Sequence, residues 1–526
     1  MHLRFTPPAL LLPLTILGLV ATLSAQPTTP AAPLPREEVA SSRGFGMGPA
    51  ATPEIVARAA AETAPVPPGT FAATWDSIRA NYAVPDWFQD GKFGIFLHWG
   101  LYAVPAHGSE WYEKHMYGNP AIAKWHQEHF GPQDKFGYKD FIPLFTCEKF
   151  DPAEWAALFK EAGAKYVVPT AEHHDGWALW DSALTKWDAK DTGPHRDLIG
   201  ELAAAVRKAG LKFGVSNHRM EHYTFIQPLP DLATDLNDPA TDDFYWVAHH
   251  TDARTEAFLK DWVDRNFELI DKYQPDLIFF DNGVNHRVYD PLKLKVAAYY
   301  YNRAREWGKQ VSITTKSEAY LAGSIRDYER QGRAPTTVQD APFQVDDTVH
   351  QRWGYLADAN YWSVTTIVQH LVENVCRNGN LLLNFSPRAD GTIPDEQKKL
   401  LRGIGAWLAV NGEAIYGTRP WTIPGEGTLT LQRGQHYAAG DIRFTQKAGN
   451  LYAVLLAWPE DGTAVITALA SGAPTALPRP IDQIAITLLG GGSEPLPFTQ
   501  DPSGLRIKLP AAKPGEDAFV LKIAGR

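Results

Sequence analysis

Over about 340 residues, segments patterned like β-strands alternate with segments patterned like α-helices, and this alternation limits the fold more than any other feature. In the clearest unit, the amphipathic segment Arg254–Tyr273 leads through the turn Pro275-Asp276 into the apolar run Leu277–Asp281. An apolar run of this length between turn residues is typical of a strand that is buried on both faces. Repeated alternation of this kind predicts parallel strands connected by helices.

The pattern predicts seven clear strands, each followed by helical or irregular sequence. They are Phe93–Trp99, Tyr166–Ala171, Lys212–Ser216, Leu277–Asp281, Val311–Lys316, Ile325–Glu329 and Leu381–Phe385. The predicted helices are Pro152–Ala162, Arg196–Ala209, Arg254–Tyr273, Leu292–Trp307, Trp362–Arg377 and Asp395–Asn411. This α/β series favours a (β/α)8-like TIM barrel with insertions, in which one strand escapes recognition, and a doubly wound sheet is the alternative.

After Pro420 the sequence changes to short β-rich runs separated by turns that contain Gly and Pro, from Ile442–Gln446 to Phe519–Ile523. This pattern predicts a C-terminal antiparallel β-sandwich, and no catalytic cluster is visible in it. The predicted division of the chain is therefore a signal peptide at 1–25, a tether at 26–69, a catalytic domain at 70–419 and a β-sandwich domain at 420–526.

The N-terminus has the pattern of an export signal. Arg4 provides a positive start, Leu10–Val20 is apolar, and Leu23-Ser24-Ala25 resembles a cleavage site. The apolar run is short for a membrane span, so the mature chain is expected to be exported, to a periplasm or outside the cell, without a membrane span. The Pro/Ala-rich segment that follows is expected to be poorly ordered, with order beginning near Trp75.

Composition excludes some partners. The net charge of −10 and the pI of about 5.9 argue against nucleic acid or an anionic membrane as the main partner. Aromatic residues are abundant, with 17 Trp, 20 Tyr and 24 Phe, which suits sugar binding but also suits an ordinary core. The two cysteines, Cys147 and Cys376, can pair or stay as thiols, and they are too few for a disulfide framework.

Polar residues gather where the predicted strands end. These strand-end residues are His98 with Glu110-Trp111, Glu172-His173-His174-Asp175, Ser216-Asn217-His218, Asp281, and Asp327-Tyr328-Glu329. In a barrel, the carboxyl ends of all strands meet at one rim. A single histidine or carboxylate is more often structural, but so many polar strand ends together predict a functional pocket.

Two chemistries could use such a pocket. Glycoside hydrolysis needs two carboxylates, with histidines and aromatic rings to hold the sugar. A metal hydrolase could use as ligands His98, His173, His174, His218 and Asp281. The metal reading is weakened because neighbouring strand residues point to opposite faces and no His-x-His pair is present. A sugar-binding protein without activity is a third alternative, against which the presence of both Asp281 and Glu329 argues.

Several long segments carry a resemblance to a known family. They are KFGIFLHWGLYAVPA (92–106) with Glu110-Trp111-Tyr112, HHDGWALWDS (173–182), GPHRDLIGEL (193–202), PDLIFFD (275–281), WGY (353–355), NGNLLLNFSPRADGTI (378–393) and GEAIYGTRPW (412–421). On these segments, the region from about Trp75 to Trp421 resembles the α-L-fucosidases of glycoside hydrolase family 29.

The resemblance implies an exo-acting, retaining α-L-fucosidase that uses no cofactor and no metal and acts on fucosylated oligosaccharides or glycoconjugates. Asp281 matches the nucleophile of the family. Glu329 is the best placed general acid/base because it ends a later predicted strand, and Glu110 is its rival. We expect Glu329 to have a raised pKa, through burial or the nearby charge of Asp281. The oligomeric state stays open, with a homo-oligomer as one alternative.

The expected sugar-binding set combines matches to the family with neighbouring strand-end and motif positions. It comprises His98, Glu110, Trp111, His173, His174, His218, Phe279 and Trp353. The chain also departs from the family pattern. The family often has Lys before the histidine pair, where this chain has Glu172, and often has Trp where it has Phe279. The end of the third strand, Ser216–Arg219, and the segment 342–355 differ as well, which indicates a divergent branch and leaves the fucosyl linkage open.

Overall fold

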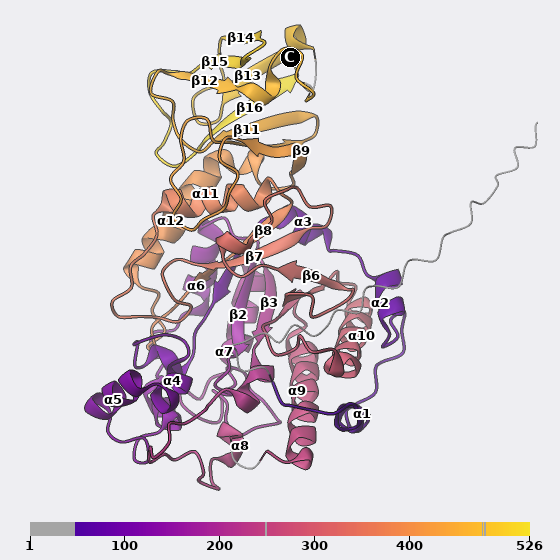
Figure 1. Ribbon diagram of the computed structural model, residues 1–526, viewed down its shortest axis with the longest axis vertical. Helices are drawn as coiled ribbons and strands as arrows, with labels where there is room; N and C mark the ends of the chain where they lie inside the picture. The colour runs from indigo at the N-terminus through magenta and orange to yellow at the C-terminus, as the bar shows by residue number, and fades with distance from the viewer. Residues whose placement is uncertain (1–47, 248–249, 476, 478–479, 526) are drawn as a thin grey trace, which may run out of the picture. The chain divides into compact units, whose positions relative to one another are not determined.

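The computed structural model describes residues 48–247, 250–475, 477 and 480–525. The predicted signal peptide and the first part of the predicted tether lie outside these residues. Residues 93–385 contain the strands of a closed parallel barrel, in the order β1-β2-β3-β4-β5-β6-β7-β8 (Figure 1). The predicted TIM-type barrel is therefore confirmed, and the doubly wound alternative is wrong.

The barrel strands match the predicted segments closely. They are β1 Phe93–Leu97, β2 Tyr166–Glu172, β3 Lys212–Asn217, β4 Leu277–Phe280, β5 Ser312–Lys316, β6 Ser324–Asp327, β7 Phe343–Thr348 and β8 Gly379–Phe385. The barrel closes through parallel pairing of β1 with β8, in which Gly94 lies opposite Leu382.

Strand β7 is the one that the sequence pattern did not reveal. Its sequence FQVDDT contains the adjacent carboxylates Asp346 and Asp347, which break an apolar run. Both carboxylates are buried, and each faces a cation: Asp346 lies 3.8 Å from Lys316, and Asp347 lies 2.8 Å from Arg433. Because each charge has a partner, the strand can be buried without being apolar.

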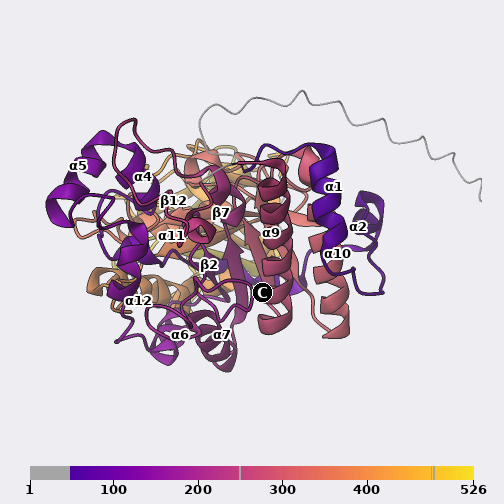
Figure 2. The same ribbon diagram turned by 90° about the horizontal axis from the view of Figure 1, so that it is seen from below.

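Helices surround the barrel (Figures 1 and 2). The predicted ones are present as α6 Pro152–Glu161, α7 Leu198–Lys208, α9 Asp252–Tyr273, α10 Asp290–Glu306, α11 Val364–Val375 and α12 Asp395–Asn411. Additional short helices are α2 Trp75–Asn81, α3 Asp86–Gly91, α4 Tyr112–Gly118, α5 Pro120–His129 and α8 Asp242–Tyr245. Their starts follow local chemistry: in α6, for example, the side chain of Asp151 accepts hydrogen bonds from Ala153 N and Glu154 N.

The expectation that order begins near Trp75 was wrong. Helix α1, Pro53–Glu62, lies within the segment that we interpreted as a tether and packs against α9 and α10 (Figure 2). Thr52 caps it by accepting a hydrogen bond from Ile55 N, and the side chains of Ile55, Val56 and Ala59 are buried. The short apolar stripe is hard to recognise in this Pro- and Ala-rich segment, although alanine is the strongest helix former.

The C-terminal part contains two antiparallel sheets, as predicted. One has the order β13-β16-β11-β10-β9 and the other the order β12-β15-β14. The strands are β9 Arg419–Glu426, β10 Ile442–Lys447, β11 Asn450–Leu455, β12 Thr463–Ile466, β13 Ile484–Leu488, β14 Phe498–Asp501, β15 Gly504–Lys508 and β16 Phe519–Gly525. Apolar residues of both sheets, among them Phe444, Leu505 and Leu521, form one buried core, which is the arrangement of a sandwich.

A buried ionic cluster joins helix α11 to strand β10. The carboxylate of Glu373 contacts Arg377 and lies 2.6 Å from Arg443, and all three side chains are fully buried. Cys147 and Cys376 are both buried and free, so the disulfide alternative is not realised. No helix of the described residues is long and apolar enough to cross a membrane.

Candidate active site

Asp281 lies directly after β4, at the carboxyl end of the barrel. Its Oδ2 accepts a hydrogen bond of 2.8 Å from His218 Nδ1, and its Oδ1 lies 2.7 Å from Lys316 Nζ. Burial would raise the pKa of this carboxyl, but Lys316 and His218 outweigh burial and hold the pKa well below its usual range. The carboxylate is therefore ionised at neutral pH and is fixed by a rigid strand, as a nucleophile requires.

Four imidazole rings surround this carboxylate, from the ends of β1, β2 and β3. The ring centres of His173 and His174 are 4.3 Å apart, those of His173 and His218 are 4.9 Å apart, and those of His98 and His218 are 5.5 Å apart. Burial lowers the pKa of His98, of His173 and of His174, the last to about 3. These three rings are neutral at physiological pH, so each can donate one hydrogen bond and accept another.

Hydrogen-bond partners determine which nitrogen carries the proton in two of these rings. His98 Nδ1 donates to the amide oxygen of Asn384 at 2.7 Å, and His174 Nδ1 donates to the main-chain oxygen of His218 at 3.2 Å. Since an oxygen of this kind can only accept, the Nε2 atoms of both rings keep a free lone pair. The His174 Nε2 lies 3.6 Å from Asp281 Oδ2, so a sugar hydroxyl beside them could donate its one proton to either acceptor.

Aromatic residues form the floor and one wall of the site. Phe279 is fully buried, with its ring 5.0 Å from Phe96 and 6.0 Å from His218. Trp353 lies 5.0 Å from the His98 ring, and Trp111 lies 6.2 Å from the His174 ring. The structure therefore brings all the predicted sugar-binding aromatic residues to this site, with Phe279 beneath the histidines.

Glu110 is buried against the Trp353 segment. Its Oε2 accepts hydrogen bonds from the main-chain nitrogens of Trp353, at 3.0 Å, and Gly354, at 3.3 Å. Burial nevertheless raises the pKa of Glu110. A carboxyl group with a raised pKa is more easily kept protonated, which is what a general acid needs.

Glu329 follows β6 and behaves differently from our expectation. Its Oε2 lies 3.1 Å from Lys316 Nζ, and Lys316 lowers the pKa of Glu329 more than burial and Asp281 raise it. The prediction of a raised pKa was wrong, because it considered the burial and the neighbouring carboxylate but not the cation. In the unliganded site Glu329 is ionised.

Lys316 is the functional residue that the sequence analysis missed. It ends β5, is buried, and contacts both Asp281 and Glu329. Because one ammonium contacts both carboxylates, their nearest oxygens lie no more than about 6 Å apart, close to the roughly 5–5.5 Å of retaining glycosidases. Lys316 could have been recognised from the sequence, because it is the last residue of the predicted strand Val311–Lys316 and the ends of barrel strands carry the chemistry.

Glu221 is a second residue of the site that the sequence analysis missed. It follows β3, is 2% exposed, and its Oε2 lies 3.7 Å from His174 Nδ1. Its Oε1 has no hydrogen-bond partner within the described part of the chain. Burial, and after it the charge of Asp281, raise the pKa of Glu221 well above its usual range. The group is therefore neutral beside the ionised carboxylate of Asp281, and it adds no negative charge to the site.

The residue after Glu329 has a strained backbone. Arg330 adopts φ 67° and ψ 147°, a conformation that favours glycine and costs other residues about 1–3 kcal/mol. Its main-chain nitrogen donates to Asp346 O at 2.8 Å, and its guanidinium lies 5.6 Å from the Trp353 ring. Strain of this kind persists where surrounding contacts impose it, which is common at functional sites.

Comparisons with known proteins agree with this geometry. The α-L-fucosidase family model matches residues 58–413, and the model of the α-L-fucosidase C-terminal domain matches residues 435–524. The tissue α-L-fucosidase of Rattus norvegicus is 33% identical over 503 residues, which cover 91% of this chain and 97% of the rat protein. The human tissue α-L-fucosidase is 34% identical over 484 residues, which cover 87% and 93% of the two chains.

A solved structure, that of the Thermotoga maritima α-fucosidase in complex with fucose, has a TM-score of 0.69 and 30% sequence identity, and covers 86% of this chain and 100% of its own. The chain belongs to the α-L-fucosidase family. It is therefore a glycoside hydrolase, and the resemblance seen in the sequence motifs is confirmed.

Two positions at which the chain departs from the family pattern, Glu172 and Arg219, form an ion pair with each other. Glu172 is fully buried, with its carboxylate 2.6 Å from Arg219 and 3.2 Å from Arg265 of α9. Asp261 of α9 lies 2.6 Å from Arg219 and 2.9 Å from Arg265. This four-residue network fixes the ends of β2 and β3, which carry the histidines, to helix α9.

The geometry also bears on the metal alternative for a fucosidase site. Two groups have ligand atoms within 4.8 Å of one another: His98, His173 and His218, and His174, His218 and Asp281. Both include His218, whose Nδ1 is bonded to Asp281 and whose Nε2 is bonded to the Ser216 hydroxyl. The Lys316 ammonium already supplies a positive charge to Asp281, so this donor set fits a metal ion poorly.

Proposed function

We propose that this member of the family is an exo-acting α-L-fucosidase that removes terminal α-L-fucosyl residues from oligosaccharides or glycoconjugates with retention of configuration. The observation that carries the proposal is the shared contact of Lys316 with Asp281 and Glu329, which keeps the nearest oxygens of the two carboxylates within about 6 Å and so supports double displacement. The neutral histidines suit an uncharged sugar, because they offer donors and acceptors without a fixed charge.

In the first step, the ionised carboxylate of Asp281 attacks the anomeric carbon while a general acid gives its proton to the glycosidic oxygen. The aglycone leaves and a covalent fucosyl-enzyme remains. In the second step, water attacks the same carbon after giving a proton to the general base, and the Asp281 carboxylate is released. Lys316 stabilises the charge of Asp281 before and after the covalent step.

Geometry favours Glu329 as the acid/base. Once Asp281 is esterified it no longer competes for Lys316, so the cation acts on Glu329 and Asp346 and favours the ionised form of Glu329 that a general base needs. As an acid in the first step, however, Glu329 must gain a proton that Lys316 opposes. Glu110, whose pKa is raised by burial, is the second candidate for this reason.

The stereochemical course tests the proposal directly. Proton NMR of the hydrolysis of an aryl α-L-fucoside should show α-L-fucose as the first product, which then mutarotates. First appearance of β-L-fucose would overturn retention. Release of other sugars from a panel of aryl glycosides, without release of fucose, would contradict the proposal that the substrate is an α-L-fucoside.

We also propose export, on the basis of the signal-like N-terminus, and we keep the predicted boundary between the catalytic and β-sandwich domains at residue 420. A human relative named plasma α-L-fucosidase, which is 31% identical over 460 residues, is compatible with a secreted protein. N-terminal sequencing of the mature chain should begin near Gln26. A mature product that retains Met1 would contradict export by cleavage.

A further inference from the structure

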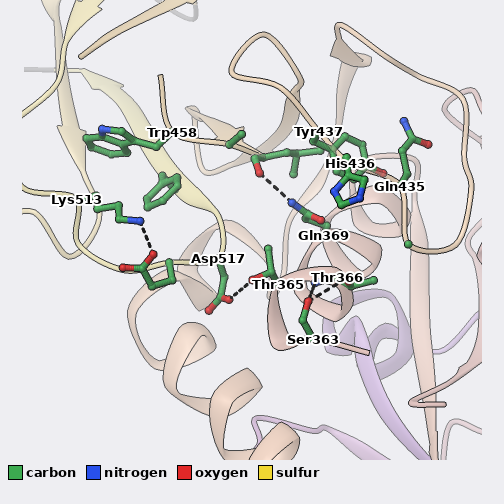
Figure 3. Close-up of a pocket in the computed structure, with 15 residues that line it drawn as sticks. Ser363, Thr365, Thr366, Gln369, Gln435, His436, Tyr437, Trp458, Lys513 and Asp517 are labelled. Atoms are coloured by element: carbon green, nitrogen blue, oxygen red, sulfur yellow. Dashed lines mark hydrogen bonds and ion pairs between the residues drawn. The ribbon is translucent and has the colours of Figure 1, made fainter. Parts of the chain in front are cut away.

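A second cavity, of about 330 Å³, lies away from the catalytic residues, where the start of α11 meets the C-terminal sheets (Figure 3). Its walls come from α11, from the loop between β9 and β10, from the residues after β11, and from the segment before β16. Its size is at the lower end of the range for small-molecule sites and is sufficient for a disaccharide.

Two half-buried aromatic residues line this cavity, Trp458 and Tyr437. The Trp458 ring rests on the buried ring of Phe519, with ring centres 4.7 Å apart and planes at 67°. Tyr437 is held by the guanidinium of Arg443, 5.7 Å from its ring. Both rings are therefore fixed before any ligand arrives, which lowers the entropic cost of binding against them.

Most polar groups of the cavity are neutral or paired, and the carboxylate of Asp517 is the one charge among the described lining residues without an ion-pair partner. Lys513 pairs with Glu516, and Asp517 accepts a hydrogen bond of 2.8 Å from the Thr365 hydroxyl (Figure 3). Gln369, which is 7% exposed, donates from its amide nitrogen to Leu456 O at 2.9 Å. Its amide oxygen and the second oxygen of Asp517 remain as acceptors for a ligand.

We infer that this cavity is a binding site for a neutral saccharide, separate from the catalytic site. Rigid aromatic rings suit the apolar face of a sugar ring, and the amide, hydroxyl and carboxylate oxygens suit its hydroxyl groups. A phosphorylated ligand would find no unpaired lysine or arginine among the described lining residues, because Lys513 is paired with Glu516. The choice of sugar as ligand rests on the proposed function, but the site itself does not depend on catalysis. The site would hold part of a glycan other than the terminal fucose.

Saturation-transfer NMR of the full chain can test this inference with neutral disaccharides that lack fucose, such as lactose, N-acetyllactosamine and cellobiose. A fucose-like iminocyclitol inhibitor would block the catalytic site. We expect transfer to at least one disaccharide to persist under this block, with a dissociation constant on the order of 1 mM. Transfer to none of them, or full displacement by the inhibitor, would overturn the second site.

Trp458→Leu keeps an apolar contact with Phe519 but removes the ring, and it should lower the transfer at least about fivefold. Hydrolysis of a small aryl fucoside should stay unchanged, because the cavity lies outside the catalytic machinery. The matched control is Trp421→Leu, since Trp421 also packs on a phenylalanine of the β-sandwich, at 5.0 Å from Phe444, but does not line the cavity. Equal transfer in wild type and Trp458→Leu, with Trp421→Leu also equal, would overturn the assignment. An enzyme inactive on fucosides that still bound the disaccharide would contradict the proposed function alone.

Discussion

The ammonium of Lys316 lies 2.7 Å from Oδ1 of Asp281, inside a site where both side chains are buried. This contact raises the pKa of Lys316 well above its usual range, despite burial, and contributes to the depressed pKa of Asp281. The pair keeps the carboxylate ionised in a place where an isolated carboxylate would tend to protonate.

Lys316→Met should lower kcat/KM of an aryl fucoside by at least about 100-fold, because the buried carboxylate loses its cation. The pKa of Asp281 should rise, so the acid limb of the pH profile should move to higher pH. The matched control is Lys293→Met, which removes another buried lysine that lies 2.7 Å from an aspartate, Asp290, outside the site. A variant Lys316→Met with an unshifted acid limb would show that the cation does not set the protonation of Asp281.

Asp281→Gly should reduce hydrolysis by at least about 1000-fold on every fucoside, because no covalent intermediate can form. Added azide should restore turnover and give the fucosyl azide of inverted configuration. Asp276→Asn is the control, since Asp276 is a buried carboxylate just before the same strand, bonded to Phe213 N at 3.1 Å. Azide without effect on Asp281→Gly would argue against this residue as the nucleophile.

Glu329→Ala and Glu110→Ala separate the two candidate acids. Loss of the true acid/base should spare fucosylation from substrates with good leaving groups, which need no proton, and should slow it on natural glycosides. Azide should then recover the second step with retained configuration. We expect this pattern for Glu329→Ala. If Glu110→Ala shows it instead, the raised pKa of Glu110 was the better guide than the distance of Glu329 from Lys316.

Exhaustive chelation should leave activity unchanged, because Asp281 is already bonded to His218 and lies against the cation of Lys316. The measurement is kcat/KM before and after dialysis against a chelator, with the metal content determined in parallel. A loss of activity that zinc restores would favour the metal hydrolase. Activity retained in a sample without metal would remove that alternative.

Lys92→Met should stabilise the fold below neutral pH. Lys92 is fully buried, its ammonium has no hydrogen-bond partner in the described part of the chain, and burial lowers its pKa from 10.5 to about 7. The unfolded chain binds the proton more tightly, so the cost is complete below about pH 7 and disappears as the pH rises towards 10.5. The gain in unfolding free energy should be on the order of 4 kcal/mol at pH 6 and small near pH 10. Lys160→Met, at an exposed position, should show no such pH dependence.

The order of the barrel and the position of Asp281 could be predicted because both depend on local pattern. Apolar runs between turn residues mark buried strands, and the residue after such a strand must lie at the rim. Strand β7 and helix α1 could not be predicted from the sequence pattern, because their stability comes from partners that are distant in the sequence. Asp346 and Asp347 need Lys316 and Arg433 to be buried, and the Ala-rich α1 needs the surface of α9.

In the site, too, features that depend on local sequence could be predicted, and features that depend on distant partners could not. The histidines and carboxylates were recognised by residue type and by their place at strand ends. The protonation of Glu329 could not be predicted in this way, because it depends on a charge that comes from another strand. The role of Glu172 was equally hidden, since its partners Arg219 and Arg265 come from the end of β3 and from α9.

The buried cluster of Glu373, Arg377 and Arg443 has a consequence for the evolution of the chain. A protein cut after the barrel would keep Glu373 and Arg377 on α11 but lose Arg443, the guanidinium from β10. Glu373 would keep Arg377, but its Oε1 would lose the two hydrogen bonds that Arg443 donates, and an unsatisfied buried acceptor costs about 1–3 kcal/mol. Loss of the β-sandwich, or its exchange for another module, therefore favours a compensating change on α11.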